Sequence, residues 1–195
     1  MTTRTKTLET MQTTKNRALL AALLLTAMVA ALVTTQAPAE ASAFPGANGK
    51  IVFASERTEG TGVDNPGGDR EIFRMNPDET GLKQLTHNTV EDGVPSYSPD
   101  GKKIVFRRQV SASNTEIFVM NADGTGQKNL TNKPADDDNP SFSPGGKKIL
   151  FDSYRNSNQD IYVMNADGGG QKRLTTDPDS DFDATFSPNN QAGDR

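Results

Sequence analysis

The chain has 195 residues, enough for one ordinary domain and a smaller segment, and its 21 Lys and Arg against 25 Asp and Glu give a net charge of −4. It has no cysteine and one histidine, so a disulfide framework and a three-histidine zinc site within one chain are excluded. The acidic balance also argues against a nucleic-acid partner, because binding phosphates requires Lys and Arg.

The N-terminal segment 1–43 is predicted to be a secretory signal peptide. It begins with the basic residues Arg4, Lys6, Lys15 and Arg17. An apolar run at residues 18–33 follows, and then a site of small residues at 41–43. This order is typical of a cleaved leader, so we expect cleavage before Phe44 and a periplasmic or secreted protein without a membrane span. The alternative is an uncleaved anchor, although the 16-residue apolar run is shorter than the about 20 residues of a spanning helix.

After this segment the chain repeats itself. Three similar phrases are EIFRMNPDETGLKQLT, EIFVMNADGTGQKNLT and DIYVMNADGGGQKRLT. Their matching isoleucines, Ile72, Ile117 and Ile161, are 45 and 44 residues apart. A period of this length is typical of propeller blades.

Each repeat contains four predicted strands. In the second repeat they are SYSP, KKIVF, EIFVM and QKNLT, and the repeats start with GKIVF at residues 49–53. The connection SPDG contains Pro99 and Gly101, which favour a tight turn between the first and second strands. NADG, from Asn121 to Gly124, has the same role between the third and fourth strands, so the repeated phrase is a hairpin.

Polarity changes from strand to strand. Residues 117–120 are all apolar although neighbouring strand residues face opposite sides, so both faces of this strand must be covered. The fourth strand is polar around one leucine, as suits a solvent-facing edge. The pattern predicts an all-β protein of about three β-propeller blades, each a four-stranded antiparallel sheet stacked on its neighbours.

The phrases SYSPDGKKIVF, EIFVMNADG, QKNLT and DDDNPSFSPGGKKILF resemble the repeats of TolB-like β-propellers, which are related to WD-type repeats. The resemblance covers residues 44–188, with blades at about 44–95, 96–140 and 141–184, the start of a next blade at 185–188 and a tail at 189–195. It implies protein–protein recognition in the cell envelope. The α/β domain that precedes the six-bladed propeller of TolB has no counterpart in this sequence.

Three blades do not close a ring, because known propellers have about four or more. The strand order after segment 1–43 is three strands, two complete blades and one first strand, TFSP, at residues 185–188. We therefore expect either half of a six-bladed ring, completed by a homodimer that shares strands, or a shortened, partial propeller with an exposed apolar face.

The connections opposite the tight turns are the expected binding side, because longer and variable loops usually carry binding residues. Asp92, Asp137 and Asp181 each stand seven residues before a repeat proline, so we expect them to ring the mouth of a central channel. No cofactor is expected, but such carboxylates make Ca²⁺ a candidate ligand; the alternative is that each caps backbone N–H groups. Candidate partner-binding residues on this side are Arg57, Asp64, Asp92, Asp137, Asp138, Asp181 and Asp183.

Other charged residues have structural interpretations. Glu71, Glu116 and Asp160 precede the third strands while Arg57 and Arg155 follow the second, which favours ion pairs between neighbouring strands. His87 is expected to be a solvated loop residue. The sequence contains neither G-x-S-x-G nor H-E-x-x-H, so catalysis has little support.

These patterns predict an exported, non-enzymatic propeller scaffold that binds a protein partner in the cell envelope. Two alternatives stay open. One is an accessory or fragment of a peptidase of the prolyl oligopeptidase type, and the other is a module that binds Ca²⁺ or a saccharide.

Overall fold

The computed structural model describes residues 49–188. The predicted signal peptide at 1–43 and the tail at 189–195 lie outside this range. Within the described residues no helix is long and apolar enough to cross a membrane.

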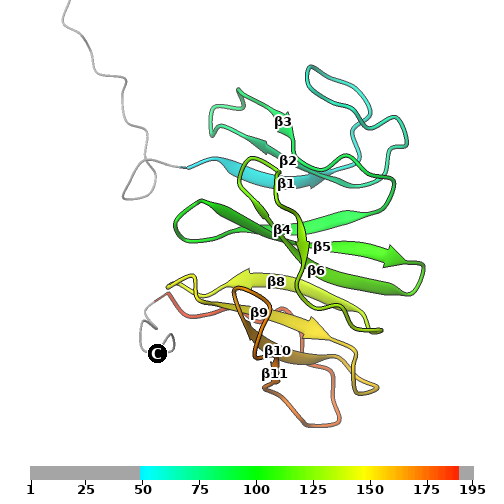
Figure 1. The fold of residues 1–195 in the computed structure, drawn as a ribbon, viewed down its shortest axis with the longest axis vertical. Coiled ribbons are helices and arrows are strands. Elements are labelled where there is room, and N and C mark those ends of the chain that lie inside the picture. Colours follow the sequence, from blue (N-terminus) through cyan, green and yellow to red (C-terminus); the bar gives the residue numbers. More distant parts are fainter. Residues whose placement is uncertain (1–48, 189–195) are drawn as a thin grey trace, which may run out of the picture. The chain divides into compact units, whose positions relative to one another are not determined.

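Three antiparallel sheets make up the described chain, and each is built from consecutive strands (Figure 1). Blade 1 has β1 (Ile51–Ser55), β2 (Glu71–Met75) and β3 (Lys83–Gln84). Blade 2 has β4 (Asp92–Tyr97), β5 (Lys103–Ser111), β6 (Asn114–Asn121) and β7 (Lys128–Asn129). Blade 3 has β8 (Asp137–Phe142), β9 (Lys148–Ser153), β10 (Asp160–Asn165) and β11 (Lys172–Arg173). The predicted all-β blades are confirmed.

The predicted turns also form. In the connection between β6 and β7, the Asn121 N–H donates to the Thr125 carbonyl at 2.8 Å and the Gly124 N–H donates to the Asn121 carbonyl at 2.9 Å. Gly124 has a φ of 96°, a left-handed conformation that glycine adopts without strain. A Cβ at this position would lie 2.7 Å from the carbonyl oxygen of Leu85 in blade 1, so this turn also packs against the preceding blade.

The first strands of blades 2 and 3 share a distortion. The pairing of β4 with β5 shifts register between Gly93 and Ser96, and the pairing of β8 with β9 shifts at the matching place. Within these shifts Val94 has a φ of 48° and Asn139 a φ of 51°. The positive φ at equivalent positions therefore marks the first strand of a blade.

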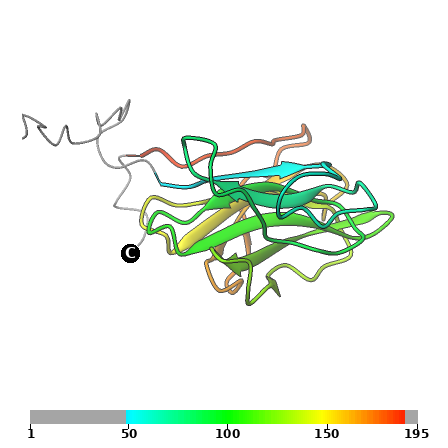
Figure 2. The same ribbon diagram turned by 90° about the horizontal axis from the view of Figure 1, so that it is seen from above.

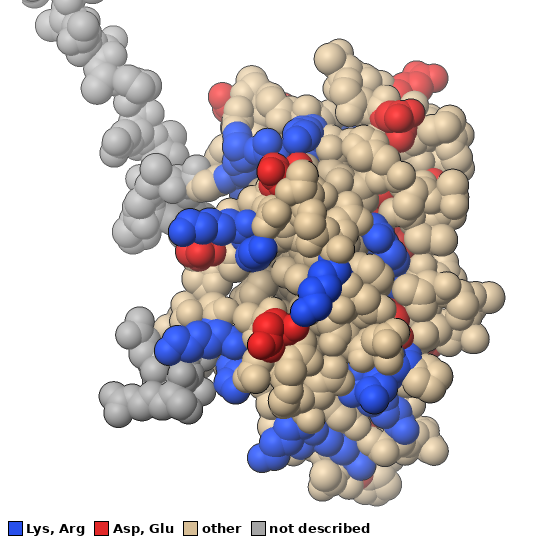
Figure 3. All heavy atoms as spheres, viewed as in Figure 1, with Lys and Arg blue, Asp and Glu red and all other residues tan. Residues whose placement is uncertain are grey.

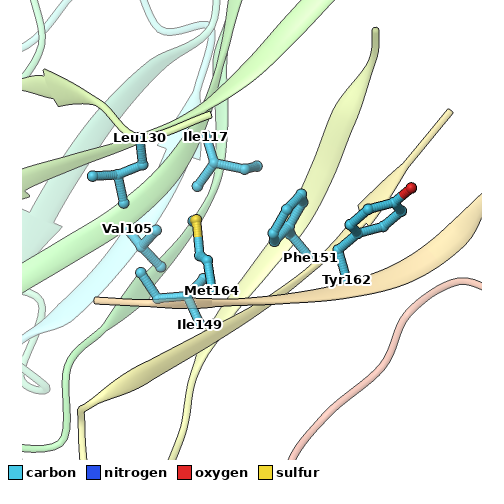
Figure 4. Packing of buried hydrophobic residues seen from close by; sticks show 7 residues of the cluster. All are labelled: Val105, Ile117, Leu130, Ile149, Phe151, Tyr162 and Met164. Carbon is cyan, nitrogen blue, oxygen red and sulfur yellow. The ribbon is translucent and has the colours of Figure 1, made fainter. Parts of the chain in front are cut away.

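The apolar faces of neighbouring blades pack on each other. Between blades 1 and 2, the buried residues are Ile72, Leu85, Ile104, Phe106 and Met120. Between blades 2 and 3, they are Val105, Ile117, Leu130, Ile149, Phe151, Tyr162 and Met164 (Figure 4). Alternate residues of β5 thus face opposite neighbours, as predicted for a strand that is apolar on both sides.

The inner strands follow one another along the stack. β4 contacts both β1 and β8, and blade 1 overlies the other two blades when the stack is seen from above (Figure 2). Each first strand therefore contacts the neighbouring blades while it completes its own.

The strand expected at residues 185–188 is not formed. This part of the chain has no strand, although it runs beside β8, where the Ser141 hydroxyl donates to the Ala184 carbonyl at 3.5 Å. β4 pairs with β5 and β8 pairs with β9, the following strand of the same blade. Within residues 49–188 no strand follows TFSP to pair with it.

Candidate functional site

The two sides of the blades carry different kinds of connection. On the side that we call the turn side lie the tight turns, and on the loop side lie the connections β1–β2, β5–β6 and β9–β10 together with those that lead into β4 and β8. Lysines recur on the turn side, where Lys50, Lys103 and Lys148 donate to asparagine side chains at 2.6–2.7 Å. Figure 3 shows Lys and Arg gathered at the left edge of the visible face, where β1, β5 and β9 begin.

Asp92 and Asp137 lie in equivalent places, at the start of β4 and of β8. Both are fully buried, and each forms an ion pair with an arginine, Arg108 in blade 2 and Arg155 in blade 3. Each carboxylate is therefore engaged by an arginine of its own blade. The described residues also contain no group of three or more His, Cys, Asp or Glu that could hold a metal ion.

Each of these ion pairs is part of a larger contact. Asp92 accepts from Nε and Nη2 of Arg108 at 2.7 and 2.6 Å, and the same guanidinium donates to Gln127 at 2.9 Å. The guanidinium carbon lies 5.3 and 4.8 Å from the ring centroids of Phe106 and Phe118. The arginine is thus held by a carboxylate, an amide and two aromatic faces at once.

Blade 3 repeats this arrangement. Arg155 donates to Asp137 at 2.8 Å and to Gln171 at 2.6 Å, and it lies over the rings of Phe151 and Tyr162. The sequence missed the pattern because the two arginines occupy different places relative to the strand phenylalanine and only the fold brings them to matching sites.

Arg57 has only part of this environment. Its guanidinium carbon lies 5.0 Å from the centroids of Phe53 and Phe73, and its Nε donates to the Ser55 hydroxyl at 3.0 Å. Within residues 49–188 it has no carboxylate partner, and Leu82 stands where the other blades have glutamine. Blade 1 therefore presents an arginine seated on its aromatic pair without the acid that completes the site in blades 2 and 3.

The predicted ion pairs at the third strands differ from expectation. Asp160 does pair across strands, but with Arg173 of β11 at 2.7 Å and not with Arg155. Glu116 instead accepts the Thr131 hydroxyl and the Lys133 N–H, the latter at 2.7 Å. Glu116 therefore fixes the connection that leaves β7, whereas Asp160 holds the outer strand β11, and both act within one blade.

Glu71 takes the equivalent place in blade 1. It is 1% exposed, and burial raises its pKa from 4.5 to about 7, against the opposing effect of hydrogen bonds from the Thr86 hydroxyl and the Asn88 N–H. The neighbouring carboxylates of Asp92 and Asp69 add to the rise. The group is an acid that titrates near neutral pH.

Asp181 and Asp183 lie in the segment that follows blade 3. Asp181 is half-buried, its N–H donates to the Gln159 carbonyl at 2.8 Å, and its Oδ2 is buried without a hydrogen-bond partner. Asp183 is exposed and accepts from Asn139 at 2.8 Å, while its N–H donates to Asp152 at 3.1 Å. Burial raises the pKa of Asp152, and the nearby Asp183 and Asp138 carboxylates raise it further.

A polar pocket of about 310 Å³ opens on the loop side between blades 2 and 3. Arg107 of β5 and Asp138 of β8 form an ion pair across it at 3.0 Å. The pocket is also lined by Asp136, Tyr154 and Gln159, among others. Asp138, one of the predicted partner-binding residues, therefore lines a pocket.

The long β1–β2 connection is also on the loop side and is anchored by Gln84. The amide of this buried residue accepts from the Asp64 N–H at 2.7 Å and donates to the Asp64 carbonyl at 3.1 Å. The Asp64 side chain itself is exposed, as is the ring of His87, which agrees with the solvated histidine that the sequence predicts.

Large apolar side chains are exposed on the loop side, and the sequence analysis did not single them out. Tyr154 is 50% exposed and Phe182 58% exposed, and Val94 and Val110 each exceed 40%. All four lie in the loop-side half of the chain's strands and connections. Together with Arg107 and Asp138 they form what we call the loop-side surface.

Two larger hollows lie on the turn side, which the sequence does not mark as a binding side. One of about 570 Å³ lies between blades 2 and 3 and is lined by Lys103, Val119 and Phe142, among others. The other, of about 500 Å³, lies between blades 1 and 2 and is lined by Lys50, Arg74 and Tyr97, among others. Each hollow is lined by residues of two neighbouring blades and is open to solvent.

Stacked antiparallel blades of three and four strands with apolar interfaces define part of a β-propeller. Residues 108–192 match the family model of the TolB beta propeller domain. This part of the chain is therefore similar to a TolB-type propeller domain, as its repeats predict.

The chain is also similar to several solved structures. A structure from Agrobacterium tumefaciens that is assigned as TolB is similar over 65% of this chain and 45% of its own, with 25% identity and a TM-score of 0.56. TolB from Acinetobacter baumannii is similar over 68% of this chain and 43% of its own, with 20% identity and a TM-score of 0.40. Hydrazine synthase from Kuenenia stuttgartiensis shares the fold over 73% of this chain and 27% of its own, with 17% identity and a TM-score of 0.56.

The chain thus spans less than half the length of either TolB structure. A comparison with curated protein sequences finds no match.

Proposed function

We propose that this chain is an exported, non-enzymatic propeller scaffold that binds a protein partner in the cell envelope through its loop-side surface. The similarity to TolB propellers supports a scaffold built for recognition. The basic, apolar and A-x-A order of residues 1–43 supports export to the periplasm or the exterior.

The observation that carries the proposal is the composition of the loop-side surface. The exposed Tyr154 lines the same pocket as the partly exposed ion pair of Arg107 and Asp138, and the exposed Phe182 follows Asp181, whose N–H donates to Gln159 of that pocket. Aromatic residues and arginine are enriched where proteins bind one another, because they bury much area and donate directional hydrogen bonds. The pocket is lined by two carboxylates, Asp136 and Asp138, and one guanidinium, Arg107. This balance favours a partner that presents basic or hydrogen-bond-donating groups to the pocket.

Site-specific photo-crosslinking tests this proposal. A photoreactive phenylalanine replaces Tyr154 in the full-length exported chain, and the control replaces Lys102, whose side chain is 79% exposed on the turn side. We expect a discrete crosslinked protein band from position 154 that is absent from position 102. Bands of equal strength from both positions, or none from position 154, would contradict the proposed surface.

Export is tested separately. The N-terminus of the chain recovered outside the cytoplasm should begin at Phe44. A chain recovered only from the cytoplasm, with residues 1–43 intact, would contradict the proposed location without bearing on the loop-side surface.

A further inference from the structure

Residues 181–183 share two features with the first strands of blades 2 and 3, although no second strand pairs with them within the described residues. Asp183 has a φ of 58°, close to the 48° of Val94 and the 51° of Asn139 at the matching positions of β4 and β8. The Asp181 N–H donates to the Gln159 carbonyl at 2.8 Å, as the Asp92 N–H donates to the Arg70 carbonyl at 2.7 Å. The segment is therefore docked on blade 3 as the start of a next blade.

Blade 1 has the opposite defect. It consists of β1, β2 and β3, and β1 has no first strand beside it within the described residues. In blades 2 and 3, β4 and β8 occupy that edge and pair Ser96 with Val105 and Ser141 with Leu150. The free edge of β1 is thus an acceptor for one more strand.

The charged groups at the two ends are complementary. Arg57 is equivalent to Arg155 but lacks the carboxylate that Asp137 supplies to Arg155. Asp181 is equivalent to Asp137, and its buried Oδ2 lacks the arginine that would pair with it. Each end holds one half of an ion pair that is complete in blades 2 and 3.

The apolar faces at the two ends are complementary as well. Leu174 is 48% exposed, whereas its counterparts Leu85 and Leu130 are 4% and 6% exposed under the following blade. Ile51 is 41% exposed, whereas its counterparts Ile104 and Ile149 are fully buried under the preceding blade. The face after blade 3 therefore matches the face before blade 1.

We propose that two copies of this chain associate head to tail, with residues 181–188 of each copy adding to β1 of the other as the missing first strand of blade 1. Asp181 of one copy pairs with Arg57 of the other, and Leu174 of one packs near Ile51 of the other. One chain does not make this contact by itself, because its segment 181–188 lies beside β8 of blade 3, and blade 2 separates blade 3 from β1 (Figure 1). Two such contacts related by a twofold axis join two sets of three blades into a closed ring.

One residue weakens the contact. Glu79 occupies the turn position of Gly124 and Gly168, where a Cβ would lie 2.7 and 2.9 Å from the carbonyl oxygens of Leu85 and Leu130. In the proposed dimer the Glu79 turn approaches Leu174 of the other copy, so the turn must shift outward. The interface between copies is therefore weaker than the interfaces between blades of one chain.

Sedimentation of the full-length chain, 21.0 kDa, over a range of concentrations tests the association. We expect the mass of two chains at high concentration, and monomers for Arg57→Glu and for Asp181→Arg. The variant that combines both changes should recover the dimer, and Asp179→Arg, an exposed acid two residues away, should leave it unchanged. Glu79→Gly should lower the dissociation constant by about tenfold.

Cysteine trapping tests the register, since the chain has no cysteine of its own. By analogy with Ser96 and Val105, Thr185 lies opposite Val52 of the other copy, so Thr185→Cys with Val52→Cys should give a disulfide-linked dimer on mild oxidation. Thr185→Cys with Phe53→Cys should not, because residue 53 faces the opposite side of the strand. A chain that stays monomeric even as Glu79→Gly, a dimer that both charge reversals leave intact, or a disulfide within one chain would each overturn the proposal.

Discussion

At the scale of single residues, the buried arginine–carboxylate pairs are the most consequential feature. Asp92 is fully buried and receives hydrogen bonds from Arg108 and from Asn88, the latter at 2.8 Å. Burying two charges is costly, and the pair is tolerated because each ion compensates the other. Loss of one partner leaves the other charge buried and unbalanced, so the cost of a substitution is much larger than the net contribution of the pair.

Replacement of Asp92 by alanine should therefore lower the free energy of unfolding by about 3–5 kcal/mol. Urea denaturation at pH 7 measures this. Asp138→Ala is the matched control, because its ion pair with Arg107 is more exposed, at 29% and 20% of the two side chains, and should cost about 1 kcal/mol or less. Equal costs for the two variants would show that burial does not set the importance of these acids.

Glu71 predicts a pH-dependent stability. Its pKa is raised to about 7 in the folded protein, so the folded state binds the proton more tightly than the unfolded state does. This contribution to stability is fully present below pH 4.5 and is lost as the pH rises through about 7. Glu71→Gln is uncharged throughout, so its stability relative to the unchanged protein should improve from pH 4.5 to pH 8 by at most about 3 kcal/mol.

Unfolding of both proteins in urea at a series of pH values checks this difference. Asp78→Asn is the control of opposite sign, since hydrogen bonds from the Thr80 hydroxyl and N–H lower the pKa of Asp78. Its contribution to stability is lost as the pH falls below 3.8, so the Asn variant should show no trend between pH 5 and 8. A flat difference for Glu71→Gln would mean that this carboxyl group is not buried as the structure has it.

At the scale of strands and turns, the sequence was most informative where local chemistry decides the conformation. The hairpins, their SPDG and NADG turns and the apolar faces of β5 and β6 were all predictable. Turn residues and the two-residue alternation of side chains along a strand both act within a few positions. The ion pairs of Asp92 and Asp137 were not predictable from the sequence. Their partners are 16 and 18 positions away along the chain, and the burial of each pair depends on the packed blade. The missing strand at 185–188 has the same cause, because a strand requires a partner that its own residues do not specify.

The turn glycines give a prediction at this scale. Gly124→Ala and Gly101→Ala both place a side chain at a positive φ, which costs about 1 kcal/mol. Only Gly124 packs against the backbone of a neighbouring blade, whereas nothing lies within 4 Å of a Cβ at Gly101. Gly124→Ala should therefore be less stable than Gly101→Ala by at least about 1 kcal/mol in thermal or urea unfolding.

If the two alanine variants unfold alike, the turn between β6 and β7 does not fix the spacing of blades 1 and 2. The position equivalent to Gly124 in blade 1 is Glu79, so the same comparison shows how strongly that residue hinders a blade placed before blade 1.

At the scale of the whole molecule, stability comes from interfaces between repeats. Each blade is apolar on both faces and contributes one face to each neighbour, so interior blades are covered twice and end blades once. Leucines at matching positions of the repeats therefore contribute differently to the free energy of unfolding, although their sequence context is the same. The sequence predicted the repeat but not which copies of a residue are covered, because coverage depends on what stands next to the end blades.

Leu130 and Leu174 make this difference measurable. Leu130→Ala removes a side chain buried between blades 2 and 3 and should lower the free energy of unfolding by about 2–5 kcal/mol at any protein concentration. Leu174→Ala removes one that is 48% exposed and should cost less than about 1 kcal/mol in dilute solution, where the chain is monomeric. At concentrations where two copies associate, Leu174 becomes covered, so its alanine variant should lose stability relative to the unchanged protein as concentration rises. A concentration-independent effect at Leu174 would mean that the face after blade 3 stays in water, and a small effect at Leu130 would mean that the blades do not stabilise one another.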